Sequence, residues 1–178
     1  GKKEFELNLL GVHNIYNALA AIAVGMELGV AYTSLHKALC RFTPTHLRLN
    51  LKKVRGISII NDTYNSNPLS MDSALKTLVN YPAISRWVVS GDMLELGSKA
   101  DSLHRMIGEK IANMQLAGLI TMGRYSRSTS LEAKRCGMGG DRLWHCRNHD
   151  EIVAVMRKYI RRGDAVLVKG SRSMRMEQ

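Results

Sequence analysis

The sequence predicts an α/β fold built around a mostly parallel sheet. Short runs of apolar, often β-branched residues alternate along the chain with helical patterns of ten or more residues, the order typical of strand–helix–strand units. Polar loops rich in Gly, Asp and Asn follow several of the apolar runs. At 178 residues, 45% of them hydrophobic, the chain is long enough for one complete domain and part of another.

The first 42 residues are predicted to form one strand and two helices. Residues 5–10 alternate between apolar and polar side chains, which is typical of a half-buried strand. A helical pattern extends over residues 15–28, and Gly29 is a typical helix stop. Thr33 or Ser34 is expected to cap a second helix that ends near residue 41.

Residues 42–45, Phe-Thr-Pro-Thr, break the helical pattern and indicate a linker. We therefore predict a domain boundary here, between residues 1–42 and 43–178. Residues 46–51 have leucine at every second position and predict a strand, which residues 52–56 turn back. The remaining predicted elements are strands at residues 57–60, 87–89, 119–122, 143–146 and 165–168 and helices at residues 69–80, 102–114, 126–136 and 150–160.

The stretch from Ile57 to Pro68 is the centre of this pattern. A buried strand gives way abruptly to a polar loop, and Asn67 before Pro68 suits the start of a helix. In open α/β sheets ligands lie beyond the carboxyl ends of such strands. Asp62 leaves the strand there and could accept hydrogen bonds from a sugar hydroxyl or from base N–H groups. The alternative is an ordinary capped turn with solvated side chains.

Two further polar loops, residues 90–97 and 169–172, also follow strands. All three loops should emerge on one edge of a parallel sheet, and this convergence indicates a binding site better than any single loop. The chain has neither a G-x-G-x-x-G nor a G-x-x-x-x-G-K-[ST] motif, so it lacks both usual phosphate-binding loops.

Two positions outside these loops also suggest binding. Asn14, Asn17 and Ala21 share one helix face, where two amides beside a small residue would fit the edge of a purine ring. The alternative is that Asn14 caps the helix and Asn17 bonds to the backbone. Arg48 follows the predicted linker, so its guanidinium could reach a neighbouring domain, although a surface arginine on a strand is an equally simple reading.

The composition limits the class of protein. The 26 Lys and Arg exceed the 15 Asp and Glu and give a net charge of +11, which favours an anionic partner. The basic residues are dispersed and not interleaved with aromatics, so a phosphate-bearing small ligand is favoured over nucleic acid. Cys40, Cys136 and Cys146 are odd in number and far apart, which argues for free thiols. No run reaches the roughly 18 apolar residues of a membrane span and no signal peptide is apparent, so we expect a cytoplasmic protein without a membrane partner.

A series of motifs in a fixed order resembles the carboxyl-terminal part of the Mur ligases. The series comprises Gly11-Val12-His13-Asn14 with Asn17 to Ala21, Arg48, Asn61 to Pro68, Gly91 to Gly97, His104, Lys169 to Met174 and Met176-Glu177. The resemblance covers nearly the whole chain. Within the family, the Asp-x-Tyr-Asn-x-Asn-Pro, Gly-Asp-Met-x-Glu-Leu-Gly and Lys-Gly-Ser-Arg forms are similar to those of the ligases that add D-alanyl-D-alanine.

The resemblance implies three domains, of which this chain would hold the end of the central ATPase domain, residues 1–42, and the whole carboxyl-terminal domain, residues 43–178. That last domain would be Rossmann-like, with helices on both faces of the sheet. The phosphate loop, the Mg²⁺ ligands and the UDP pocket are expected in the remaining N-terminal and central domains. The chain alone is therefore expected to be inactive, and the whole protein to be a monomer.

The implied reaction is ATP-dependent amide formation. ATP would phosphorylate the carboxylate of a UDP-MurNAc-peptide, the amine of D-Ala-D-Ala would attack the acyl phosphate, and phosphate would leave. By resemblance, His13, Asn14 and Asn17 would line the adenine, Arg48 would reach the phosphates and Asp62 would hold the ribose or adenine. The residues expected near the dipeptide and the acyl phosphate are Tyr64, Asn65, Asn67, Lys169, Ser171 and Arg172. Arg48 and Lys169 are the expected catalytic residues, and Ser66 departs mildly from the family pattern, where Ala is more familiar.

Other readings stay open at this point. The chain could come from another Mur ligase that adds a different amino acid, or from the related folylpolyglutamate synthases. It could also be a non-catalytic, basic nucleotide- or nucleic-acid-binding module.

Overall fold

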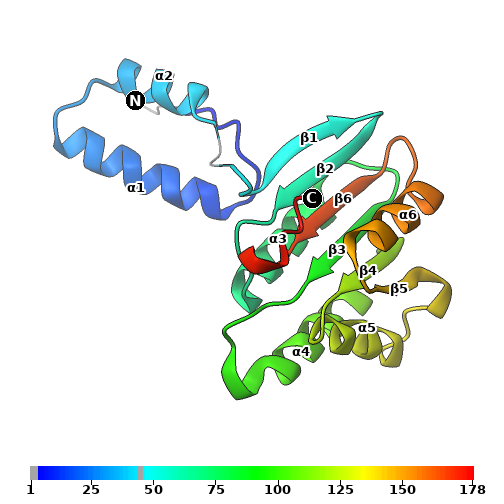
Figure 1. Cartoon of the computed structure of the whole chain (residues 1–178). Helices are drawn as coiled ribbons and strands as arrows, with labels where there is room; N and C mark the ends of the chain where they lie inside the picture. Colours follow the sequence, from blue (N-terminus) through cyan, green and yellow to red (C-terminus); the bar gives the residue numbers. More distant parts are fainter. Residues whose placement is uncertain (1–3, 44–45) are drawn as a thin grey trace.

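The computed structural model describes residues 4–43 and 46–178, which form a pair of helices and a six-stranded sheet (Figure 1). The helices are α1 (His13–Glu27), α2 (Tyr32–Arg41), α3 (Pro68–Asn80), α4 (Ala100–Ala112), α5 (Ser126–Arg135) and α6 (His149–Tyr159). The strands are β1 (Asn50–Val54), β2 (Ile57–Asp62), β3 (Arg86–Gly91), β4 (Gly118–Met122), β5 (Leu143–Cys146) and β6 (Ala165–Lys169). None of the helices in the described ranges has the length and apolar character that crossing a membrane requires.

The sheet has the order β1-β2-β6-β3-β4-β5, and every neighbouring pair is parallel except β1 with β2. The predicted, mostly parallel α/β sheet is therefore confirmed. Strands β2 and β3 follow each other along the chain but are not neighbours in the sheet, because β6, the last strand of the chain, lies between them. The strand order changes direction at β6, and ligands of open α/β sheets bind outside the carboxyl ends of strands at such a point.

Two apolar layers cover the sheet, one on each face. Helices α3, α4 and α5 pack on one face, where the buried residues include Met71, Leu75, Leu78, Ile107, Ile111 and Ala133 over Ile60, Val88, Leu119 and Leu167. Helix α6 packs on the other face, where Ile152 and Ile160 join Trp87, Val89, Ile120, Val166 and Met176. Alternate side chains of each central strand enter opposite layers, which explains why these strands are continuous apolar runs.

The predicted strands and helices after residue 57 are confirmed to within a few residues. Helix α3 begins as expected, with Pro68 as its first residue and Asn67 as its cap. Asn67 Oδ1 accepts a hydrogen bond from Ser70 N at 2.8 Å, and Ser70 Oγ accepts one from Asn67 N at 3.1 Å. This reciprocal capping box fixes the direction in which the chain leaves the polar loop.

The strand predicted at residues 5–10 is wrong. These residues pair with no strand in the described part of the chain, and their polar contacts are made instead with the two helices, with α1 through Leu10 O and with α2 through Asn8. Asn8 Nδ2 donates to Cys40 O at 2.9 Å, and Tyr32 Oη donates to Glu4 O at 2.6 Å. The alternation of apolar residues reflects packing along a helix rather than a sheet.

The capping residue predicted for α2 is also wrong, whereas the helix itself is confirmed. Ala31 occupies the cap position without a side-chain hydrogen bond, so Thr33 and Ser34 lie inside the first turn. Helix α1 likewise has Val12 at its cap, which removes the alternative role of Asn14 as the helix cap.

The strand predicted at residues 46–51 begins only at Asn50 and continues to Val54. Leu47 and Leu49 adopt left-handed φ values of 65° and 45°, which end any extended pattern there. The turn predicted over residues 52–56 is confined to Arg55-Gly56, with φ values of 51° and 81°. Residues 44–45 of the predicted linker, like Lys2 and Lys3, lie outside the described residues. The three thiols are free, as predicted.

Candidate functional site

A cavity of about 820 Å³ lies between α1 and the carboxyl edge of the sheet. Its volume is within the range typical of sites for small molecules and cofactors. Polar side chains from four parts of the chain line it, and its walls are partly apolar. The polar lining residues include His13, Asn14, Asn17, Arg48, Asp62, Tyr64, Asn65, Asn67, Ser70, Ser73 and Lys169, and the apolar ones include Leu7, Leu9, Ala21, Leu39 and Phe42.

The sheet places an ion pair at the floor of this cavity. Asp62 and Lys169 are the last residues of β2 and β6 and lie directly opposite each other in the parallel register. Lys169 Nζ lies 2.5 Å from Asp62 Oδ2 and donates to Asn65 O at 2.9 Å. Lys169 is only 1% exposed. A buried ammonium group requires such partners, because an unpaired charge in this position would be strongly destabilising.

Burial lowers the pKa of Lys169 below the ordinary lysine value, and the charge of Arg48 acts in the same direction. The carboxylate of Asp62 opposes both effects. A lysine with perturbed ionisation inside a cleft is typical of a functional site, although structural ion pairs produce the same signature.

Asp62 also holds the turn that carries Arg48. Its Oδ1 accepts a hydrogen bond from Leu49 N at 3.1 Å, and Leu47 O accepts one from Tyr64 N at 3.0 Å. Both leucines are buried, so the exposed side chain of Arg48 projects between them towards the cavity. Its guanidinium carbon lies 4.0 Å from the centre of the Tyr64 ring, a cation–π arrangement that limits the directions the arginine can take.

Helix α1 supplies the opposite wall. His13 Nδ1 lies 2.9 Å from Ser73 Oγ of α3 and so joins the helical pair to the sheet. Asn17 Nδ2 donates to Asn14 Oδ1 at 3.2 Å, and Asn14 Nδ2 donates to Leu10 O at 2.7 Å. The two amides therefore lie on one helix face, as predicted, and Ala21 follows them along the same wall.

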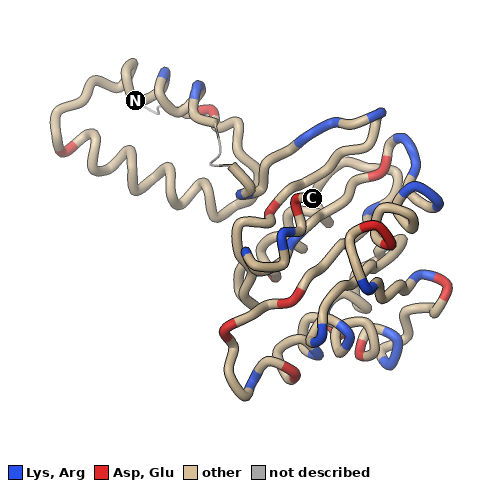
Figure 2. The backbone as a smooth tube through the Cα atoms, in the orientation of Figure 1, with Lys and Arg blue, Asp and Glu red and all other residues tan. Residues whose placement is uncertain are grey.

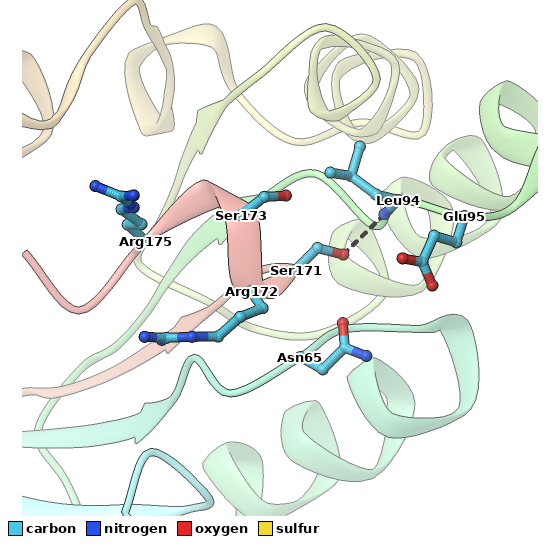
Figure 3. Close-up of a pocket in the computed structure, with 7 residues that line it drawn as sticks. All are labelled: Asn65, Leu94, Glu95, Ser171, Arg172, Ser173 and Arg175. Carbon is cyan, nitrogen blue, oxygen red and sulfur yellow. Dashed lines mark hydrogen bonds between the residues drawn. The ribbon is translucent and has the colours of Figure 1, made fainter.

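A second cavity of about 420 Å³ opens beside the first and shares Asn65 with it. Leu94, Glu95, Ser171, Arg172, Ser173 and Arg175 also line it (Figure 3). Ser171 Oγ accepts a hydrogen bond from Leu94 N at 2.8 Å, and Ser171 N donates to Asp92 O at 2.8 Å. Figure 3 shows Ser171 between Leu94 and Asn65, where it ties the loop after β3 to the loop after β6.

The loop after β3 is held in place by hydrogen bonds to α4 and α5. His104 Nε2 accepts a hydrogen bond from Met93 N at 3.0 Å, while its Nδ1 lies 2.7 Å from Ala100 O. Met93 N can donate only to an unprotonated Nε2, so the ring proton is on Nδ1. Asp92 Oδ1 accepts from Ser126 N, the first residue of α5, at 2.7 Å. These contacts hold Glu95, whose φ is 62°, at the rim of the second cavity.

The structure brings the predicted residues together in two adjoining groups. Asn65 lines both cavities, and Ser171 and Arg172 line the second. The other predicted residues line the first cavity: His13, Asn14, Asn17, Arg48, Asp62, Tyr64, Asn67 and Lys169. Glu95 lies at the same edge as Asp62 and Lys169, as expected of its loop, whereas Ser173 and Arg175 line the second cavity without having been predicted as site residues. The apolar wall formed by residues 7, 9, 39 and 42 was not predicted either, because it depends on how the N-terminal segment packs beside α2.

The residues lining the first cavity do not form a magnesium site. Asp62 is the one carboxylate among them, and it is committed to Lys169 and to Leu49 N. In the described ranges, no cluster of three or more His, Cys, Asp or Glu residues could hold a metal ion. Mg²⁺ usually requires carboxylate and water oxygens in octahedral geometry, which this lining does not offer.

Comparison with known protein families gives the class. The family model described as "Mur ligase, glutamate ligase domain" matches residues 47–172, from the turn that carries Arg48 to the loop after β6. The chain belongs to the Mur ligase family.

Relatives indicate the branch of the family. The chain is 33% identical over 176 residues to the UDP-N-acetylmuramoyl-tripeptide–D-alanyl-D-alanine ligase of Bacillus subtilis, covering 98% of this chain and 38% of the relative. It is 30% identical to the Escherichia coli enzyme of the same name, covering 100% of this chain and 38% of the relative. A crystal structure of MurF from Acinetobacter baumannii superposes with a TM-score of 0.88 at 29% identity, covering 99% of this chain and 39% of that one. The chain thus spans well under half the length of these relatives.

Proposed function

We propose that the chain forms the carboxyl-terminal part of an ATP-dependent ligase that adds D-alanyl-D-alanine to a UDP-MurNAc-peptide. The observation that carries the proposal is the shared cavity, in which Arg48, Asp62 and Lys169 face the amides of Asn14 and Asn17. Cationic groups, a hydrogen-bonding wall and an apolar shelf in one cleft suit a nucleotide and a reacting phosphoryl group.

The first step would transfer the terminal phosphoryl group of ATP to the peptide carboxylate, giving an acyl phosphate and ADP. The free amine of the dipeptide would then attack the acyl carbon, forming the amide bond and releasing phosphate. The protein's contribution to such a reaction is mainly positioning and charge neutralisation. Because the residues lining the cavity do not suit Mg²⁺, the metal would be held by the other domains of the protein and not by this chain.

Arg48 would neutralise the phosphate oxygens, since an exposed guanidinium stacked on Tyr64 is already directed at the cavity. Lys169 would act from the floor of the first cavity. Its ammonium group is fully engaged with Asp62 and Asn65 O, so it would hold the polar loop and contribute positive potential. His13, Asn14 and Asn17 would line the adenine. Both carboxylate oxygens of Asp62 have partners here, so contact with the ribose would add to these bonds or replace one.

The second cavity would take the dipeptide. Asn65, Ser171 and Arg172 lie there, and Arg172 can bind a carboxylate through paired N–H groups. In the present arrangement Arg172 Nη1 lies 2.6 Å from Glu177 Oε1, so an incoming carboxylate would compete with Glu177 for the guanidinium. Tyr64 and Asn67 line the first cavity instead and would contact the dipeptide only where the two cavities meet.

The chain would work together with further domains of the same protein, which would supply the phosphate loop, the Mg²⁺ ligands and the UDP pocket. The length of the relatives supports this part of the proposal. Within it, residues 1–42 would be the end of the nucleotide-binding domain, and movement about residues 42–45 would close Arg48 onto the nucleotide.

The test is an assay of the full protein with ATP and UDP-MurNAc-peptide and with D-Ala-D-Ala, meso-diaminopimelate or lysine as the amine. The proposal requires amide formation and phosphate release with D-Ala-D-Ala. Turnover with another amine in its place would assign the protein to a different branch of the family. No turnover with any amine, together with salt-dependent binding of random DNA, would favour the non-catalytic reading.

A further inference from the structure

The edge of the sheet opposite the candidate site is strongly basic. Three segments meet there. They are residues 51–56 at the β1–β2 turn, residues 81–86 before β3, and residues 157–163 between α6 and β6. These segments contain no acidic residue and eight basic ones, Lys52, Lys53, Arg55, Arg86, Arg157, Lys158, Arg161 and Arg162. Figure 2 shows this blue grouping along β1, its turn and the end of α6, and we call it the basic edge.

Backbone contacts join the three segments into one surface. Gly163 N donates to Gly56 O, and Ile84 N donates to Gly163 O, both at 2.9 Å. The side chain of Arg162 covers Gly56 so closely that a Cβ atom at Gly56 would lie 2.6 Å from Arg162 Cγ. The basic edge is therefore a fixed arrangement of charges rather than a chance approach of separate loops.

The charges of the basic edge are not neutralised locally. Seven of the eight cations are exposed, and Arg86, which is half-buried, donates to the carbonyls of Leu78 and Tyr81. Within the described ranges none of the eight forms an ion pair. The neighbouring carboxylate of Asp164 is buried, where it accepts from Trp87 Nε1 and Arg161 N.

Apolar side chains lie among these cations. Ile84 is 80% exposed and contacts the Gly163 loop, where a Cβ atom would lie 2.5 Å from Ile84 Cδ1. Val54, beside the Arg55-Gly56 turn, is also exposed. An aliphatic tip surrounded by Lys and Arg fits the boundary between lipid headgroups and acyl chains. A nucleic acid would leave that tip in water, since its backbone offers phosphates and sugars to such a surface.

We infer that the basic edge is a docking surface for an anionic phospholipid bilayer, with Ile84 entering the headgroup region. Each Lys or Arg close to an anionic membrane strengthens binding by roughly fivefold. The candidate site lies at the carboxyl ends of β2 and β6, so it would remain accessible in a docked protein. The basic edge lies at the opposite ends of these strands (Figure 1). The expectation of no membrane partner rested on the lack of a spanning segment and of a signal peptide, and neither has a bearing on surface binding.

The test is co-sedimentation of the full protein with vesicles of phosphatidylglycerol and phosphatidylcholine. The wild type should bind these vesicles, should not bind pure phosphatidylcholine, and should dissociate as NaCl is raised. In the variant with Lys52, Lys53, Arg55 and Arg162 all changed to Gln, the partition coefficient should fall by roughly 600-fold, the product of four fivefold losses. Ile84→Ser should lower it severalfold without removing the salt dependence.

The control changes four exposed cations elsewhere, Lys99, Arg127, Lys134 and Arg142, to Gln, so that the net charge is the same. Thermal unfolding checks that all variants are folded. Equal loss of vesicle binding in both four-site variants would overturn the proposal, because net charge alone would then explain it. Binding of duplex DNA through the same four residues without vesicle binding would also overturn it. Unchanged binding by Ile84→Ser would exclude entry of that side chain into the headgroup region.

Discussion

Asp62 and Lys169 lie directly opposite each other at the carboxyl ends of β2 and β6, with Lys169 Nζ 2.5 Å from Asp62 Oδ2. The two residues are 107 positions apart in sequence, and only the insertion of β6 beside β2 brings them together. Since Asp62 also accepts from Leu49 N, this pair connects the centre of the sheet to the turn that carries Arg48. The geometry of the first cavity therefore depends on it.

Loss of Lys169 should destabilise the domain strongly. In Lys169→Met the partly buried carboxylate of Asp62 would lose its partner, and such a loss costs up to about 3 to 5 kcal/mol where the remaining charge is fully buried. Urea unfolding of the purified chain measures the change. The double variant Asp62→Asn/Lys169→Met is the control and should recover part of the loss. If both variants lost the same stability, packing rather than the unpaired charge would be responsible.

The same pair predicts a pH dependence. Because burial lowers the pKa of Lys169, the unfolded chain holds this proton more tightly than the folded chain between the lowered pKa and the ordinary value of about 10.4. In that window the free energy of unfolding should therefore rise with pH for this group. The wild type should gain stability relative to Lys169→Met as the pH increases towards about 10. A relative loss over this window would mean that Asp62 raises the lysine pKa instead.

Arg48→Ala should lower the turnover of the full ligase by roughly a hundredfold to a thousandfold, the usual effect of removing a group that stabilises transition-state charge. The fold should be unaffected, since the Arg48 side chain is exposed. Steady-state kinetics with all three substrates measure the effect. Arg127→Ala, which removes another exposed arginine, is the matched control and should behave as wild type. Wild-type turnover in Arg48→Ala would refute the assignment.

Tyr64 should act through Arg48. Tyr64→Phe keeps the ring below the guanidinium and should leave kcat/KM for ATP unchanged, whereas Tyr64→Ala should lower it about two- to fivefold. The combined variant Arg48→Ala/Tyr64→Ala should be no worse than Arg48→Ala alone. Additive losses in the combined variant would show that the ring has a separate contact with substrate.

Asn67→Ala should destabilise the domain by about 1 kcal/mol, because the first turn of α3 would lose its capping oxygen. Asn67→Asp keeps an acceptor at the same position and should be close to wild type. Thermal unfolding of the two variants compares them directly. A loss of similar size in Asn67→Asp would point to the amide donor instead of the cap.

The central strands and the helices after them could be predicted because their residues are buried on both faces. A short run of apolar residues such as Trp87 to Val89, between polar segments, is typical of a central strand, and Asn67-Pro68 marks a helix start through local hydrogen bonding alone. The convergence of Asp62 and Lys169 on one edge followed from the parallel arrangement without knowledge of the strand order.

The errors have a common physical origin in long-range contacts. Leu47 and Leu49 have left-handed backbones that leucine seldom adopts. Two hydrogen bonds hold them in this conformation, one from Tyr64 N to Leu47 O and one from Leu49 N to Asp62 Oδ1. Residues 5–10 alternate as a strand would, yet their hydrogen-bond partners belong to α1 and α2. Glu95 was expected at this edge of the sheet, but its positive φ could not be inferred from the loop sequence.

The central place of β6 also has a consequence for how the protein is made. Until residues 165–169 leave the ribosome, β2 and β3 have no strand between them, and two apolar edges of the nascent sheet stay open. Folding of this domain during translation must therefore wait for a segment synthesised more than a hundred residues after β2. A chaperone that shields open strand edges would be most useful during that interval.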